Sequence, residues 1–260
     1  MKQLVLILFV FIGFAVSGRE PADYDVLSER AERYFKYKEW GSALAIYQMM
    51  IVDRPEAVEP YYKAIAAGAM LGDGEVQMDM FERTQQHGVS LDSLFNGVRK
   101  VSFTMGTAKA YEEFLLLVKD RQPWLSRNVC IYLLDYYMYR NDSQNVKEIT
   151  QELLEHTPDN VEYLKCFANA CMQLGDFENM EIYFKRVLEI DNHDEDALVA
   201  LGNYYAGMLL GQIEPDSIKY NREQLARLSL ETLSKACNMN ASPYLTSLMA
   251  RVNAAIASQP

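Results

Sequence analysis

The sequence predicts an all-α fold, a right-handed α-solenoid of about six helical hairpins closed by a C-terminal capping helix. Three observations lead to this prediction. Apolar residues recur at helical spacing, as in Leu27, Ala31 and Tyr34. No stretch alternates convincingly between apolar and polar residues, as a half-buried strand would. Two distant segments, 40–55 and 177–192, match in their aromatic and aliphatic positions, which indicates an internal repeat.

The match follows from a sequence pattern that repeats along the chain, with a first copy starting at Tyr24 and a second at Val58. The two matching segments occupy the same positions within their copies of this pattern. The pattern has small residues at positions 8 and 20, aromatic residues at positions 11 and 24, and proline at position 32. These residues are Ala31, Ala43, Tyr34, Tyr47 and Pro55. Proline ends a helix because it lacks an N–H and disfavours helix in the residue before it. The pattern resembles the tetratricopeptide repeat, whose units are pairs of antiparallel helices.

The resemblance implies one superhelical domain, residues 19–260, built from six repeats. They are expected near 24–57, 58–91, 92–126, 127–160, 161–194 and 195–242. The second and third repeats keep few residues of the pattern, so irregular packing is expected there. The sixth carries an insertion at about 206–222, with Asp216 or Ser217 expected to cap a longer second helix. Residues 243–258 are expected to form the capping helix.

Residues 1–18 predict a cleaved signal peptide. Lys2 precedes an apolar run from Leu4 to about Val16, and small residues follow, with cleavage expected after Ser17 or Gly18. The run has about 13 residues, whereas a spanning helix needs roughly 20. We therefore expect an exported protein of the periplasm, cell envelope or exterior, without membrane insertion after cleavage.

The composition argues against nucleic-acid binding and catalysis. A formal net charge of −11 without a dense basic stretch is unsuited to binding phosphate backbones. The motifs of zinc hydrolases, serine hydrolases and nucleotide-binding loops do not occur in the sequence. His87, His156 and His193 each follow a second helix and are expected in separate surface loops. We expect no catalytic residue, metal or cofactor.

The four cysteines, Cys130, Cys166, Cys171 and Cys237, are expected to be buried free thiols rather than disulfides. Cys166 and Cys171 would point to different faces of one helix. Cys130, Cys171 and Cys237 fall in apolar helical stripes, where a cysteine packs as a small hydrophobic residue.

The resemblance also implies where a partner binds. In tetratricopeptide proteins, positions 2, 5, 9 and 12 of each first helix point into a concave groove. The implied partner-binding residues in this groove are Tyr62, Ile131, Asp135, Met138, Tyr139, Lys165, Asn169, Met172 and Asn203. Amide, aromatic and thioether side chains suit an extended peptide or a partner helix. For each residue, sealing neighbouring repeats together is the alternative.

These expectations favour a non-enzymatic scaffold that binds a protein or peptide partner of unknown identity. A clamp for chaperone tails is disfavoured because Ala200 stands where that clamp needs asparagine. Two alternatives stay open. The insertion at 206–222 could form a small-molecule or glycan site, with or without enzymatic activity. The exposed ends of the solenoid could instead mediate self-association, and the sequence does not indicate the oligomeric state.

Overall fold

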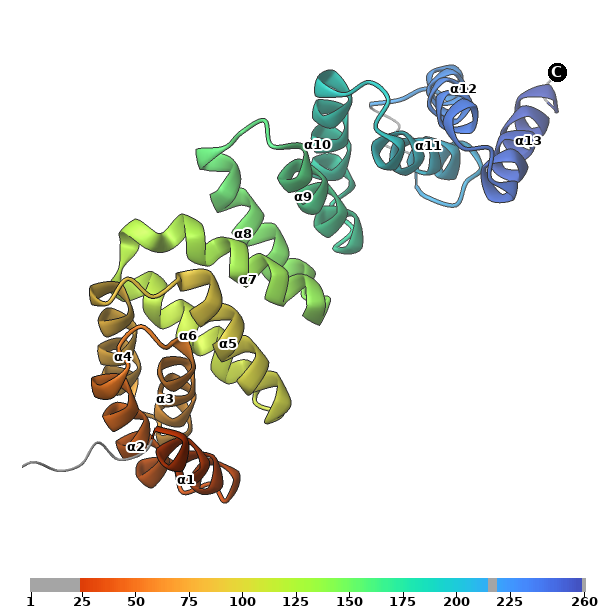
Figure 1. Cartoon of the computed structure of the whole chain (residues 1–260). Helices are drawn as coiled ribbons and strands as arrows, with labels where there is room; N and C mark the ends of the chain where they lie inside the picture. Colours follow the sequence, from red (N-terminus) through yellow and green to blue (C-terminus); the bar gives the residue numbers. More distant parts are fainter. Residues whose placement is uncertain (1–23, 215–218, 259–260) are drawn as a thin grey trace, which may run out of the picture. The chain divides into compact units, whose positions relative to one another are not determined.

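The computed structural model describes residues 24–214 and 219–258. Within these ranges the chain forms thirteen α-helices and one short 3-10 helix, and no strand occurs there (Figure 1). The predicted all-α fold is confirmed. The expected signal peptide, residues 1–18, lies outside the described residues.

Twelve of the helices form six consecutive hairpins, and the thirteenth packs against the last of them. Proline residues follow shortly after several second helices, as the repeat pattern predicts. The hairpins are α1 (Tyr24–Lys36) with α2 (Trp40–Asp53), α3 (Val58–Leu71) with α4 (Gly74–Gln86), α5 (Leu91–Thr104) with α6 (Ala108–Arg121), α7 (Ser126–Arg140) with α8 (Ser143–His156), α9 (Val161–Gln173) with α10 (Phe177–Ile190), and α11 (Glu195–Leu209) with α12 (Arg222–Met239). The short helix η1 (Pro123–Leu125) precedes α7, and α13 (Pro243–Ala257) ends the series.

A left-handed residue lies in the turn of every hairpin. Its N–H bonds back to a carbonyl near the end of the first helix, which satisfies groups that the helix end leaves unpaired. Glycine adopts this conformation readily because it has no Cβ. The six residues, with their φ angles, are Lys38 (63°), Gly72 (69°), Gly106 (71°), Asn141 (53°), Gly175 (75°) and Gly211 (71°). Asp73, Asp142 and Asp176 then cap the following helices.

The chain divides into two compact units between Leu117 and Val118, within α6. We call them the N-terminal unit and the C-terminal unit, and each is described by itself. The predicted single superhelical domain and its right-handed twist stay predictions.

The N-terminal unit has an aromatic core that goes beyond the repeat pattern, because only Phe81 occupies one of the pattern's aromatic positions. Phe81, Phe95 and Phe114 come from α4, α5 and α6, are almost fully buried, and have ring centroids 5.8–6.0 Å apart. Such contacts stabilise a core beyond simple burial. The second and third repeats are therefore held by their own phenylalanine cluster, although they keep few residues of the family pattern.

The C-terminal unit differs from the prediction at its insertion. The hairpin that starts with α11 at Glu195 does not begin its second helix until Arg222, a longer interval than in the other five hairpins. α11 continues to Leu209, so the added residues begin after that helix and not at residue 206. The expected cap at Asp216 or Ser217 is wrong. Asn221 caps α12 and forms a reciprocal capping box with Gln224, which satisfies two helix-end donors.

The cysteines are free thiols, as predicted, although their burial differs. Cys130 and Cys171 are buried, while Cys166 and Cys237 are half-buried. Burial raises the pKa of the Cys130 and Cys171 thiols to about 11, which keeps both protonated at neutral pH. Among the described residues, no helix combines the length and the apolar character that crossing a membrane requires.

Candidate functional site

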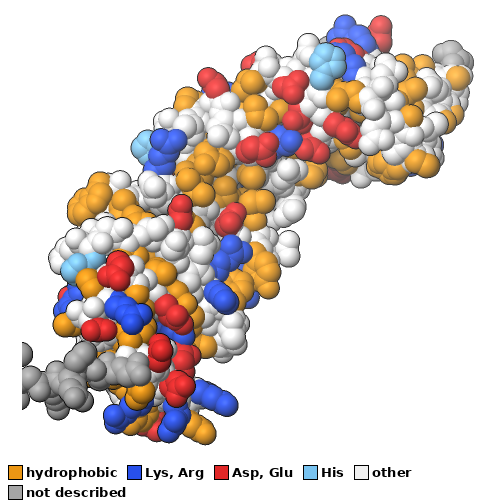
Figure 2. Space-filling view, viewed as in Figure 1, with side chains coloured by type: hydrophobic (Ala, Val, Ile, Leu, Met, Phe, Trp, Pro, Cys, Tyr) orange, Lys and Arg blue, Asp and Glu red, His pale blue; other side chains and the backbone are white. Residues whose placement is uncertain are grey.

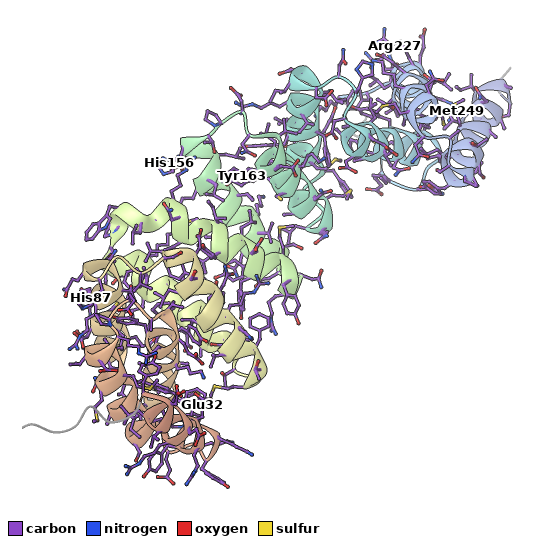
Figure 3. The ribbon with its side chains drawn as sticks, viewed as in Figure 1. Glu32, His87, His156, Tyr163, Arg227 and Met249 are labelled. Atoms are coloured by element: carbon purple, nitrogen blue, oxygen red, sulfur yellow. The ribbon has the colours of Figure 1, made fainter. Side chains whose placement is uncertain are left out.

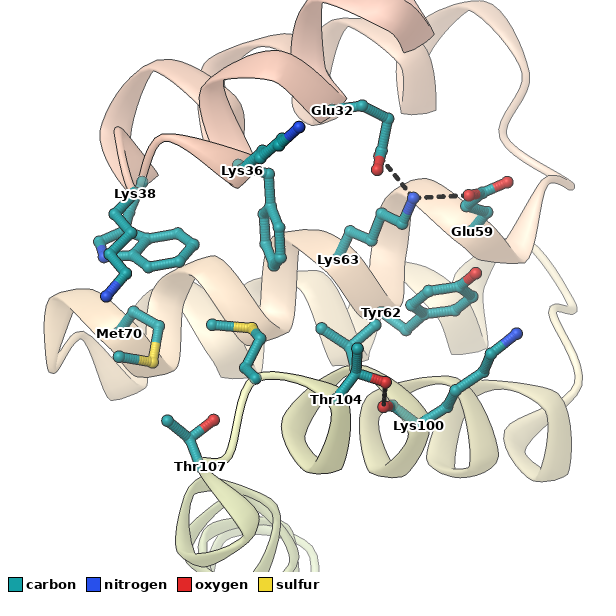
Figure 4. Close-up of a pocket in the computed structure, with 14 residues that line it drawn as sticks. Glu32, Lys36, Lys38, Glu59, Tyr62, Lys63, Met70, Lys100, Thr104 and Thr107 are labelled. Atoms are coloured by element: carbon teal, nitrogen blue, oxygen red, sulfur yellow. Dashed lines mark hydrogen bonds and ion pairs between the residues drawn. The ribbon is translucent and has the colours of Figure 1, made fainter.

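A pocket of about 530 Å³ opens on the N-terminal unit, bounded by α1, α3 and α5 (Figure 4). We call it the lysine-rimmed pocket. The helices that bound it are the first helices of three successive hairpins, and the turn residues after α1 and α5 complete it. Its lining residues are Glu32, Phe35, Lys36, Lys38, Trp40, Glu59, Tyr62, Lys63, Met70, Lys100, Val101, Thr104, Met105 and Thr107.

Close packing of α3 against α5 positions Tyr62 in this pocket. A Cβ atom added at Gly97 would lie 2.2 Å from the Tyr62 ring. Only glycine leaves room for the ring at this approach. Tyr62 is half-buried, so one face of the ring packs on α5 while the remainder is available in the pocket. The predicted binding residue Tyr62 therefore also holds neighbouring repeats together.

Lys63 joins two hairpins at one side of the pocket. Its ammonium lies 2.7 Å from the Glu59 carboxylate and also pairs with Glu32 of α1 (Figure 4). Burial alone would lower the pKa of Lys63, but hydrogen bonds to Glu32 and Glu59 outweigh it and raise the pKa. Glu32 additionally accepts a hydrogen bond of 2.9 Å from the Tyr47 hydroxyl. This cation is therefore satisfied internally.

The apolar lining of the pocket is only half-buried. Phe35 and Trp40 pack edge to face with ring centroids 5.0 Å apart, and Met70 and Met105 lie nearby in the lining. All four side chains retain partial exposure to solvent. Covering them with another apolar group would be favourable at about 25 cal/mol per Å² of apolar surface removed from water.

Three exposed lysines surround this apolar lining. Lys36 ends α1, Lys38 lies in the turn that follows, and Lys100 lies on α5. In contrast to Lys63, none of the three makes an ion pair with a carboxylate within the described ranges. Figure 4 shows Lys36 and Lys38 on one side of the pocket and Lys100 on the opposite side.

The other eight predicted binding residues all lie on the first helices of the C-terminal unit, α7, α9 and α11. Met138 of α7 and Cys166 of α9 bring their sulfur atoms within 3.9 Å. Met138 and Asn169 line a second cavity of about 260 Å³ with Cys166. The exposed fractions of the predicted apolar residues are Ile131 43%, Met138 49%, Tyr139 63% and Met172 39%, and Asp135 is also exposed. The structure thus places these side chains at the surface, and their binding role stays a prediction.

Lys165 and Asn203, also predicted to bind, already have partners within the unit. The Lys165 ammonium lies 2.5 Å from Asp196 and 3.1 Å from Asp194. Hydrogen bonds to Asp196 and Asp194 raise the pKa of Lys165 above its ordinary range. Asn203 accepts a hydrogen bond of 2.9 Å from the hydroxyl of Tyr244 on α13. Both residues therefore join neighbouring helices.

Two residues near the end of the insertion, Lys219 and Tyr220, help to surround a buried carboxylate. Glu181 of α10 is 1% exposed and accepts hydrogen bonds from Tyr205, Lys219 and Tyr220. Lys185 on the same helix is a further partner at 2.6 Å. Burial would raise the pKa of Glu181, but hydrogen bonds from Lys185, Tyr220, Lys219 and Tyr205 outweigh burial and lower it to about 2. This cluster fastens residues 219 and 220 to α10.

The small-molecule site proposed for 206–222 is not supported by this cluster, because the carboxylate is covered by its own donors. Residues 215–218 lie outside the described ranges. That alternative stays a prediction.

Sequence reasoning missed most of the lysine-rimmed pocket. Of its lining, only Tyr62 was among the predicted binding residues. The same groove positions in the first and third repeats are occupied by Glu32, Phe35 and Lys100, so the rule applied to every repeat would have found them. Lys38 and Trp40 lie outside first helices, and no position rule includes them.

The histidines do not assemble into a metal site. His87, His156 and His193 are all exposed, and Figure 3 shows His87 and His156 at the outer ends of their own hairpins. Among the described residues, no cluster of three or more His, Cys, Asp or Glu side chains could hold a metal ion. On the face drawn in Figure 2, acidic and basic side chains are interspersed with apolar ones.

The described helices follow one another as six all-α hairpins like those of tetratricopeptide proteins. No family model and no curated protein matches the chain. Several solved structures are similar in fold. A protein from Bacteroides ovatus is 16% identical with a TM-score of 0.46, and the match covers 76% of this chain and 97% of that one.

Two further solved structures carry the name of the repeat. A TPR repeats protein from Bacteroides fragilis is 14% identical with a TM-score of 0.39, covering 89% of this chain and 98% of that one. YrrB, a TPR protein with an unusual peptide-binding site, is 19% identical with a TM-score of 0.28, covering 86% and 96%.

Proposed function

We propose that this protein is a non-enzymatic interaction module that binds an extended peptide or a segment of a partner protein. The lysine-rimmed pocket is the observation that carries the proposal. It lies on the first helices of successive hairpins and combines half-buried aromatic and methionine side chains with exposed cations. Such a surface offers an apolar anchor point surrounded by polar contacts, which is the usual arrangement for recognising a peptide.

Selection of a random peptide library on the mature chain tests this function. We expect enrichment of peptides whose binding weakens when Phe35→Ala or Met105→Ala removes part of the pocket lining. The matched control is Val52→Ala on α2, because Val52 is 78% exposed and does not line the pocket. Circular dichroism of each variant checks that it remains folded. Failure to enrich any peptide that depends on the pocket would contradict the proposed function.

The proposal includes export to the periplasm or cell envelope. It is supported by residues 1–18, in which a lysine, an apolar run and small residues follow one another. N-terminal sequencing of the protein purified from its native host should begin at Gly18 or Arg19. Recovery of the protein with its first residues intact in the cytosolic fraction would contradict this part of the proposal.

A further inference from the structure

We propose that the lysine-rimmed pocket recognises an acidic peptide segment that carries one bulky apolar side chain. This inference rests on the proposed function and names the chemistry of the partner. The apolar side chain would lie on the aromatic and methionine lining. Carboxylates on either side of it would pair with the exposed lysines at the two edges of the pocket.

The charge of the pocket is opposite to that of the chain. Its lining contains four lysines and two glutamates, whereas the whole chain has 25 basic and 36 acidic residues. Lys63 neutralises much of the charge of Glu32 and Glu59. The cations left for a ligand are Lys36, Lys38 and Lys100, and a partner of complementary charge is acidic.

The backbone at Lys38 provides an independent indication. Lys38 adopts a left-handed conformation with φ of 63°, whereas four of the other five hairpin turns have glycine at this place, at residues 72, 106, 175 and 211, and the fifth has Asn141. A residue with a Cβ is disfavoured in this region relative to glycine. The turn makes the same backbone hydrogen bonds in each case, so the hairpin itself does not require lysine. What the lysine adds is an ammonium group in the lining of the pocket.

The apolar part of the ligand follows from the lining. Phe35, Trp40 and Tyr62 provide aromatic faces and edges, and Met70 and Met105 provide flexible thioethers. A volume of about 530 Å³ is within the range of pockets that enclose a small ligand or a large side chain with its backbone. One phenylalanine or leucine side chain of a peptide would cover these aromatic and methionine side chains, which are partly exposed to solvent.

The positions of the lysines favour a peptide over a single small anion. Lys36 and Lys38 approach from the end of α1, and Lys100 approaches from α5 across the pocket (Figure 4). Cations separated in this way match several carboxylates spaced along a chain. A phosphate or sulfate ion would require donors that converge on one point.

Fluorescence anisotropy with labelled peptides tests the inference on the mature chain. The probe is a short peptide with a central phenylalanine flanked by aspartates. One control peptide replaces the aspartates with lysines, and another replaces the phenylalanine with alanine. We expect only the probe to bind appreciably, and its affinity to fall with added salt because exposed ion pairs are screened.

The matched protein variants separate the pocket from general electrostatics. Lys36→Ala, Lys38→Gly and Lys100→Ala combined should weaken probe binding by about tenfold or more, because three exposed ion pairs are lost. The control combines Lys109→Ala, Lys235→Ala and Arg251→Ala, which removes the same charge outside the pocket and should leave affinity within about twofold. Thermal melting by circular dichroism checks folding of both proteins.

The outcomes distinguish the inference from the proposed function. Equal binding of the lysine-flanked or alanine peptide, full competition by inorganic phosphate, or no effect of the pocket variant would overturn the acidic-peptide inference. Library selection that enriches pocket-dependent peptides without acidic residues would overturn it too, while leaving the interaction module standing. If library selection enriches no peptide that depends on the pocket, both the acidic-peptide inference and the proposed interaction function are wrong.

Discussion

Lysines on the first helices of the hairpins have different roles in the two units. In the C-terminal unit, Lys165 lies between Asp194 and Asp196 and joins α9 to α11. In the N-terminal unit, Lys63 pairs with Glu59 on its own helix and with Glu32 of α1. Three further lysines lie beside it without such partners among the described residues. The bridging lysines are part of the packing, whereas the additional ones remain available to a ligand.

The comparison shows that the groove positions of the repeat predict which surface a side chain lies on, but not whether that side chain is available to bind a partner. Two groove residues of the C-terminal unit, Lys165 and Asn203, already bond to a neighbouring helix. A paired polar group binds a partner only after its existing interaction is broken, which reduces the net gain. Exposed cations beside half-buried apolar side chains carry no such cost, and this combination occurs in the lysine-rimmed pocket.

The largest expected effect concerns acid stability of the C-terminal unit through Glu181. Its pKa is lowered from 4.5 to about 2 in the folded protein. Its contribution is therefore present above pH 4.5 and is lost as the pH falls toward 2. The shift corresponds to about 3 kcal/mol in the free energy of unfolding. Hydrogen exchange of α10–α12 across this pH range measures the loss.

Glu181→Gln should remove that pH dependence and destabilise the C-terminal unit at neutral pH. Glu189→Gln is the matched control, since Glu189 is exposed on the same helix. If the stability of both variants, measured by hydrogen exchange, decreases between pH 4.5 and 2 as much as that of the unmodified protein, the role assigned to Glu181 is wrong.

The next largest effect concerns packing beneath the pocket of the N-terminal unit. Gly97→Ala places a methyl group against the Tyr62 ring, so we expect a loss of about 1–3 kcal/mol in unfolding free energy. Displacing Tyr62 should also weaken binding of the acidic probe peptide. Gly41→Ala on α2 is the control, because no atom lies within 4 Å of its added Cβ. Urea denaturation compares the two, and equal stability of both variants would show that α3 and α5 are less closely packed.

A smaller effect compares the two bridging lysines directly. Lys63→Met and Lys165→Met each remove a partly buried cation that holds two carboxylates, with side-chain exposure of 13% and 18%. We expect each to cost about 1 kcal/mol of stability, because such pairs are partly screened by solvent. Lys63→Met additionally leaves Glu32 and Glu59 unneutralised in the pocket, so it should reduce affinity for the acidic peptide more than Lys165→Met. If Lys165→Met bound the acidic peptide more weakly than Lys63→Met, the distinction between structural and binding lysines would be wrong.

The smallest expected effect concerns Lys38, where one substitution should increase stability and weaken binding. Lys38→Gly should stabilise the N-terminal unit by about 1 kcal/mol, because glycine adopts positive φ without strain. The same change should weaken binding of the acidic probe, because an ammonium is lost from the pocket. The mirror experiment is Gly175→Lys in the C-terminal unit, which should cost about 1 kcal/mol. Thermal melting and anisotropy measure the two quantities, and a destabilised Lys38→Gly would contradict the strain argument.

Much of the helical framework could be predicted because its signals are local. Pro55 and Pro158 follow the ends of α2 and α8, since proline cannot continue a helix. Asp73 and Asp176 cap the next helices directly after left-handed glycines. The first helices consequently begin within one residue of the expected repeat starts. At the insertion, Asn221 rather than Asp216 or Ser217 caps α12, because several residues could cap a helix locally and packing selects one.

The candidate site could be predicted only in part. The groove positions led to Tyr62, because one helix period determines which residues share a face. Trp40 and Met105 were missed because they reach the pocket from outside the first helices. Their places depend on how α1 and α5 pack on either side of α3.

The sequence by itself determined the number, order and approximate limits of the helices, because turn residues, prolines and helical spacing act over a few neighbouring residues. Only the tertiary structure decided which charged groups neutralise one another. Lys63 meets Glu32, and Lys219 meets Glu181, although each pair is far apart along the chain. Such pairs form where backbone packing brings side chains within about 4 Å. Lys36, Lys38 and Lys100, which make no ion pair among the described residues, lie around the proposed binding pocket.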